Sequence, residues 1–139
     1  MSNIAGEEKI INKERAIQFL SNYENLLKCT PGISKINNKE FSASVKVGPL
    51  NVEVQGTIVE HKVENNKVFD KIEVKGPGII VTISTVVIVE DHKLSWEAEY
   101  ELSGSLAKAL ESTITKQAKE LTKQIISCSV SAINSSNNS

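Results

Sequence analysis

Arginine is nearly absent from this sequence. Arg15 is the only one, and lysine supplies the other basic residues. Arginine is the side chain that most often binds phosphates and base edges through paired hydrogen bonds, so its scarcity argues against a nucleic-acid partner. The formal net charge of -1 agrees, because it produces no long-range field that would attract a polyanion. We therefore expect no nucleic acid among the partners.

Long apolar runs are also missing. No stretch approaches the roughly 18 apolar residues that a membrane-spanning helix needs. The amino-terminal residues have neither the basic start nor the apolar segment of a secretory signal. We therefore expect a cytoplasmic protein, with peripheral contact at the inner face of the membrane as an alternative.

Cysteine and histidine are scarce, with two of each. Cys29 and Cys128 form no CxxC pair, and neither His61 nor His92 has further ligands at metal-binding spacing. We predict no metal site and no cofactor. We also predict reduced cysteines, because disulfides are rare in the cytosol. A Cys29–Cys128 disulfide stays open as an alternative if the end of the last helix passes the first helical corner.

The amino-terminal part of the chain predicts one strand and two short helices. Weak alternation of apolar residues favours a strand over residues 4–11. Asn12 can cap a helix that begins at the next residue. A second helix is predicted over Tyr23–Lys28, because the following Pro31-Gly32 cannot continue it.

The middle of the chain alternates apolar and polar residues with a period of two, the pattern of half-buried strands. Turn sequences such as Gly48-Pro49 and the Gly-Pro-Gly at 76–78 separate these strands and imply antiparallel neighbours. The predicted strands cover residues 41–47, 52–58, 68–75, 79–89 and 94–103.

A long amphipathic helix is predicted after Gly104, with Ser105 as its cap and its end near Ile133. Its apolar face is expected to consist of Leu106, Leu110, Ile114, Ala118, Leu121, Ile125 and Cys128. A one-sided sheet must cover its apolar face, and this helix is the only element large enough. The predicted fold class is α+β, a curved antiparallel sheet wrapped around a long C-terminal helix. Residues 1–133 form the single predicted domain, and 134–139 a disordered polar tail.

Three stretches resemble, in order, those of a known family: "CTPGI" at 29–33, "VKVGPLNVEVQGTIV" at 45–59 and "LSWEAEYELSGSLAKAL" at 94–110. From about Gly6 to Ile126 the chain is similar to the carbon monoxide dehydrogenase CoxG family. That family belongs to the helix-grip (SRPBCC, START-like) superfamily. It usually has glycine where Leu110 stands, so the resemblance implies a narrower cleft or a more distant helix here.

The resemblance implies a non-catalytic accessory protein. Family members are thought to serve molybdenum-containing enzymes such as carbon monoxide dehydrogenase. They are thought to carry a lipophilic electron acceptor such as a quinone, or to recruit the enzyme to the membrane. The implied partners are a lipophilic small molecule, which is a quinone or a lipid, and a molybdenum hydroxylase subunit. The alternatives are an assembly or membrane-recruitment adaptor without a ligand and a cyclase- or hydrolase-type enzyme on the same fold.

The inner face of the predicted sheet is nearly all apolar, with Thr85, Tyr100 and Glu60 as its polar candidates. Such a face suits a lipophilic ligand better than a transition state, which needs convergent polar groups. A filled core would show the same pattern. The candidate lining of the cleft is Phe41, Val54, Ile58, Ile72, Val81, Ile83, Trp96, Ala98, Tyr100, Leu110 and Ile114.

The candidate reactive residues each have a simpler interpretation. Cys29 ends a helix, where the dipole disfavours a thiolate, so we predict a structural role. His61 and His92 are expected on the surface, in a polar strand position and in a hairpin. A row of glutamates in the last strand is expected to face solvent and not to form an acid–base pair. That row is Glu97, Glu99 and Glu101.

Strand 79–89 is apolar on both faces. If Ile83 and its alternate neighbours face inward, then Ile80, Val86 and Ile88 face outward. An outward apolar row can form a homodimer or partner surface. A central strand partly covered by loops would have the same pattern.

Overall fold

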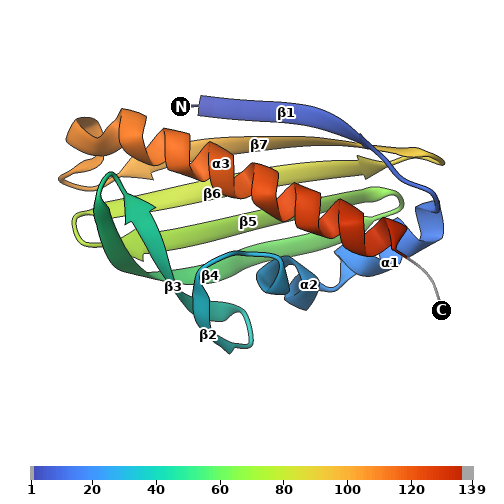
Figure 1. Cartoon of the computed structure of the whole chain (residues 1–139), viewed down its shortest axis with the longest axis horizontal. Helices are drawn as coiled ribbons and strands as arrows, with labels where there is room; N and C mark the ends of the chain where they lie inside the picture. The colour runs from blue at the N-terminus through green and yellow to red at the C-terminus, as the bar shows by residue number, and fades with distance from the viewer. Residues whose placement is uncertain (1, 136–139) are drawn as a thin grey trace.

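The computed structural model describes residues 2–135, which form a sheet with one long helix across it (Figure 1). The strands are β1 (Ser2–Lys9), β2 (Ile33–Asn37), β3 (Glu40–Val47), β4 (Leu50–Glu64), β5 (Lys67–Gly76), β6 (Ile79–Val89) and β7 (Lys93–Ser103). The helices are α1 (Lys13–Ser21), α2 (Tyr23–Lys28) and α3 (Ala107–Asn134).

The seven strands form one antiparallel sheet in the order β1-β7-β6-β5-β4-β3-β2. Consecutive strands from β2 to β7 are joined by short turns and pair with each other. The first strand, β1, pairs with β7 and forms one edge of the sheet. The helix α3 crosses one face of this sheet, packing chiefly on β7 with further contacts to β1 and β3 (Figure 1). The predicted fold class is therefore confirmed.

Asparagine side chains set the two short helices where the sequence predicts them. The Asn12 Oδ1 accepts a hydrogen bond from the Arg15 N–H at 2.9 Å, which caps α1. Asn22 ends α1 and caps α2, accepting from the Glu24 N–H at 3.0 Å. The turn between them therefore needs no residues beyond Asn22.

The start of α3 differs from the prediction, because Ser105 is not its cap. The helix begins at Ala107 after Leu106, which makes no side-chain capping bond. The Leu106 N–H donates instead to the Gly78 carbonyl at 2.8 Å. Gly104 has φ +108, and a Cβ there would lie 2.6 Å from the Gly78 carbonyl oxygen. The turn at Gly104 therefore packs closely against the turn at Gly78. This contact, and not a side-chain cap, decides where α3 starts.

The buried row of α3 also differs from the predicted one. The predicted Leu106 precedes the helix and is exposed, Leu121 and Ile125 are half-buried, and Cys128 is exposed. With 3.6 residues per turn, the residues of α3 that face the sheet include some polar ones. A search for apolar residues alone overlooks these positions. The buried residues are Ile114, Ala118, Thr122, Ser129 and Ile133.

The buried Thr122 is the hydrogen-bond partner of the buried Tyr100 hydroxyl. The Thr122 hydroxyl donates to the Ala118 carbonyl at 2.8 Å, which uses its only proton. The Tyr100 hydroxyl must therefore donate to Thr122 Oγ1, at 2.5 Å. Burial raises the pKa of Tyr100, which keeps its proton in place for this bond.

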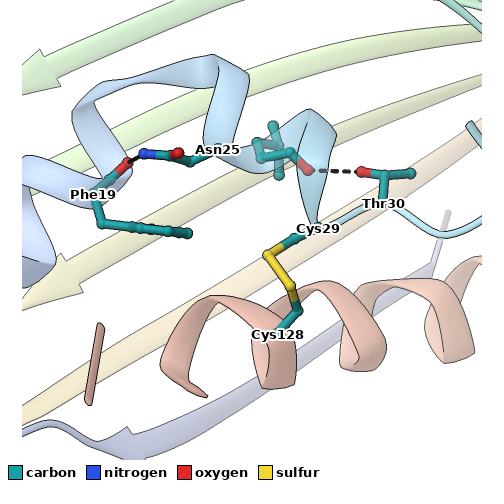
Figure 2. The surroundings of a disulfide bond; sticks show 6 residues. Phe19, Asn25, Cys29, Thr30 and Cys128 are labelled. Atoms are coloured by element: carbon teal, nitrogen blue, oxygen red, sulfur yellow. Dashed lines mark hydrogen bonds between the residues drawn. A yellow bond between two sulfur atoms is a disulfide. The ribbon is translucent and has the colours of Figure 1, made fainter. Parts of the chain in front are cut away.

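A disulfide joins Cys29 to Cys128, so the prediction of two reduced cysteines is wrong (Figure 2). The α carbons lie 5.6 Å apart across a sequence separation of 99. The pairing required α3 to pass the end of α2, and contacts between α2 and α3 show that it does. Cys29 is the carboxyl-terminal cap of α2, as expected, and is buried.

The last residue of α3 is fastened as well. Asn134, placed in the tail by the sequence, accepts from the Ile11 N–H and donates to the Lys9 carbonyl, both at 3.0 Å. The preceding Ile133 is only 1% exposed and packs with Ile10. The remainder of the predicted tail, residues 136–139, lies outside the described residues.

We predict that reducing the disulfide lowers stability by about 2–5 kcal/mol, because it closes a long loop in the unfolded chain. Thermal unfolding with and without a reductant measures this. A Cys29→Ala/Cys128→Ala variant serves as the control, since a reductant should leave its melting temperature unchanged. An unchanged melting temperature of the natural chain on reduction would contradict the prediction.

We also predict that Thr122→Val costs about 1–3 kcal/mol, because it leaves the buried Tyr100 hydroxyl without an acceptor. Tyr100→Phe combined with Thr122→Val should recover most of that loss, since both polar groups are then gone. Urea unfolding of the two single variants and the double variant measures the coupling. Strictly additive effects would show that the bond contributes nothing.

Candidate functional site

The predicted cleft residues lie on the helix-facing side of the sheet but in separate clusters. Phe41, Val54 and Ile58 pack with Leu27 of α2. Trp96 belongs to a second cluster, around the end of α3. Ala98 and Tyr100 lie fully buried under Ala118, and Val81 and Ile114 are buried too. Whether these residues bind a ligand stays a prediction.

The remaining predicted residues are incompletely covered. Ile72 on β5, Ile83 on β6 and Leu110 on α3 are all half-buried. Central strands of a sheet covered by a helix would normally be its driest part. Here α3 packs mainly on β7, β1 and β3, which lie to either side of β4–β6. Ile72 packs against the cluster around Leu27 and Ile83 against the one around Tyr100, and both side chains stay partly exposed.

Two cavities open beside the carboxyl-terminal half of α3. The first, which we call the helix cavity, measures about 360 Å³. It is lined by Arg15, Gln18, Phe19, Asn22, Asn25, Ala132 and Ile133. The second, the strand cavity, measures about 180 Å³ and is lined by Glu8, Trp96, Lys123, Ile126, Ser127, Val130 and Ser131. Of the predicted cleft residues, Trp96 alone lines either cavity, and its Nε1–H donates to Glu8 at 3.3 Å.

His61 is not the surface residue that the sequence predicts. The pairing of β4 with β5 shifts between Ile58 and Glu60, so Val59 forms a bulge. Beyond such an extra residue, the side chains that would face outward face inward, and the reverse. Glu60, a candidate for the inner face, is exposed, whereas the His61 side chain is 11% exposed and faces its strand partner Asp70. Single-sequence periodicity has no signal for such a bulge.

His61 joins the sheet to the end of α1. Its Nδ1 lies 2.5 Å from Asp70 Oδ1, and its Nε2 lies 2.9 Å from the Ser21 carbonyl oxygen. Since a carbonyl can only accept, Nε2 carries a proton, and the Asp70 contact shares a second one. Burial raises the pKa of Asp70, and the hydrogen bond and charge of His61 partly offset that rise. Both ring nitrogens are engaged, so His61 supports α1 and has no free nitrogen for chemistry.

The other candidates agree with their simpler interpretations. His92 lies exposed in the β6–β7 hairpin, and the glutamate row of β7 faces solvent. Within residues 2–135, no group of three or more His, Cys, Asp or Glu is placed to hold a metal ion.

The outward row of β6 is half-buried. It consists of Ile80, Val86 and Ile88. Over residues 2–135, no helix is long and apolar enough to cross a membrane.

We predict that His61→Ala destabilises the protein more as the pH rises. Without His61 the pKa of Asp70 rises further, because only burial then acts on it. An acid whose folded pKa exceeds its unfolded value loses its stabilising contribution as the pH rises through the folded pKa.

Urea unfolding of His61→Ala and of the natural chain across a pH series measures this difference. The part of the difference that changes with pH through Asp70 should disappear when Asp70→Asn is added to both proteins. A difference that stays constant with pH while Asp70 is present would contradict the account.

Solved structures share this architecture at low sequence identity. A conserved protein from Geobacillus kaustophilus is 16% identical, with a TM-score of 0.70 and 95% of each chain covered. The Zhui aromatase/cyclase from Streptomyces sp. R1128 is 5% identical, with a TM-score of 0.62 over 95% of this chain and 93% of that one. Truncated norcoclaurine synthase from Thalictrum flavum is 13% identical, with a TM-score of 0.60 over 98% and 95%. These likenesses show the helix-grip fold alone.

The family comparison goes further than the fold. The search of curated proteins found no match for this chain. The model of one family, however, matches residues 6–134, which include all three sequence stretches that suggested the resemblance. The chain belongs to the CoxG family of carbon monoxide dehydrogenase subunits.

Proposed function

We propose that this protein is a non-catalytic accessory protein that binds a lipophilic molecule, a quinone or a lipid, between its sheet and α3. The observation that carries the proposal is the half-buried apolar surface of Ile72 and Ile83 on the central strands. Because α3 packs chiefly to the sides of these strands, a flat apolar ligand can lie beneath it. Burial of that surface by the ligand would supply the binding free energy.

The polar groups near this surface favour binding over catalysis. The Tyr100 hydroxyl donates to Thr122, and both ring nitrogens of His61 have partners within the protein. Catalysis of a cyclase or hydrolase type needs groups that converge on a substrate instead. The aromatase/cyclase and the norcoclaurine synthase with this fold keep an enzymatic role as the alternative.

Family membership supports the choice of ligand and partner. The redox enzyme that we propose this protein serves is a molybdenum-containing, carbon monoxide dehydrogenase-like hydroxylase. A lipophilic electron acceptor such as a quinone is the ligand that such an enzyme could use. An adaptor without a ligand is the alternative, with the outward row of β6 as its contact surface.

The test is a titration with decylubiquinone, a short-chain quinone. We expect a dissociation constant below about 100 μM for the natural protein. Leu110→Trp should weaken binding by about tenfold or more, because the larger side chain enters the space beneath α3 from its first turns. Leu50→Trp is the matched control, since Leu50 is 64% exposed in the β3–β4 hairpin, and it should bind as the natural chain does.

Two results would overturn the proposal. Absence of binding by the folded natural protein would leave the adaptor as the better account. Equal affinities of Leu110→Trp and the natural chain would show that the quinone binds away from α3 and the central strands. Native mass spectrometry of gently purified protein adds an independent check, because a bound lipophilic molecule should be retained.

A further inference from the structure

The helix cavity is separate from the surface beneath α3. It lies between α1 and α2 on one side and the last turns of α3 on the other. Its volume of about 360 Å³ is within the range of small-molecule pockets, which measure roughly 300–1,000 Å³. None of the residues proposed to line the inner cleft contributes to it. A ligand of this cavity would therefore be a different ligand.

The charge of the cavity is positive. Arg15 is the only arginine of the chain, and no acidic side chain is among the lining residues. The ion pairs formed within residues 2–135 all involve other side chains. A guanidinium offers paired donors that match the two oxygens of a carboxylate. The missing counter-charge therefore points to an anion.

Two of the amides that line the cavity form hydrogen bonds with the backbone. Asn22 Oδ1 accepts from the Glu24 N–H, which uses its oxygen and leaves its NH₂ group as a donor. Asn25 Nδ2 donates to the Phe19 carbonyl at 2.9 Å (Figure 2). Arg15 and the Asn22 amide thus place fixed or charged donors on the same cavity, as an anion requires.

Apolar side chains line the cavity on both sides. On the α3 side Ala132 is exposed and Ile133 is almost fully buried, and on the α1 side Phe19 is half-buried. The disulfide joins the end of α2 to α3 beside the cavity (Figure 2). Asn25 precedes Cys29 by one helical turn, and Ala132 follows Cys128 by one. The α2 and α3 sides of the cavity are therefore joined covalently, one helical turn from Asn25 and from Ala132.

We propose that the helix cavity binds a small organic carboxylate with an apolar body, such as a medium-chain fatty acid. The carboxylate pairs with the Arg15 guanidinium, and the hydrocarbon packs on Phe19 and Ala132. This site does not depend on the quinone site proposed above. The two sites use different elements and different ligand chemistry.

The test is an NMR titration of the full, ¹⁵N-labelled chain with sodium octanoate. We expect saturable shifts of the backbone amides at Asn22, Asn25 and Ala132. Arg15→Gln should weaken binding by about tenfold or more, the size expected for a lost charge-assisted pair. Lys28→Gln is the matched control, because Lys28 is an exposed cation on α2 outside the cavity. Ala132→Trp keeps the charge but fills the cavity, and it should weaken binding as well.

Four outcomes would overturn the proposal. One is no saturable binding of octanoate. Another is binding that shifts residues of β5 and β6 and is unchanged by Arg15→Gln, which would place octanoate beneath α3. A third is equal affinity for 1-octanol, which would exclude a role for the guanidinium. The fourth is equal affinity for inorganic phosphate, which would exclude a role for the apolar side chains. The quinone titration with Arg15→Gln should match that of the natural chain, so the two proposals fail separately.

Discussion

The disulfide between Cys29 and Cys128 holds the carboxyl-terminal half of α3 against the two short helices. Ile133 is buried one turn further on, and the Asn134 amide closes the end of the helix onto the chain after β1. These three contacts come from different parts of the sequence and act on the same segment. The position of α3 over the sheet, and so the space on either side of it, depends on this attachment.

Two polar pairs on the helix-facing side of the sheet are satisfied within the protein. Tyr100 and Thr122 bond each other beneath α3, and His61 links Asp70 of β5 to the end of α1. Such pairs remove the cost of burying a lone polar group and fix the helices in register with the strands. Apolar side chains of the central strands such as Ile72 and Ile83 stay half-buried on this face. That distribution is suited to holding a molecule.

Local signals made much of the fold predictable from the sequence. Asn12 indicated the start of α1, Pro31-Gly32 the end of the helical corner, and the period-two stretches the strands. The bulge at Val59 was not predictable, because one extra residue shifts the phase without changing composition, and it moved His61 to the inner face. The disulfide was only an alternative at the level of the sequence, because its formation depends on where the end of α3 lies in space. The candidate cleft was predictable only as a set of inward positions, since a period-two pattern does not say whether a face is filled.

The central claim is that a lipophilic molecule lies between α3 and the central strands. The most direct measurement is the pattern of intermolecular nuclear Overhauser effects between bound decylubiquinone and isoleucine methyl groups of the labelled protein. The account predicts contacts from the quinone to Ile72 and Ile83. Contacts confined to Ile133, or to the outward-facing Ile80 and Ile88, would contradict it.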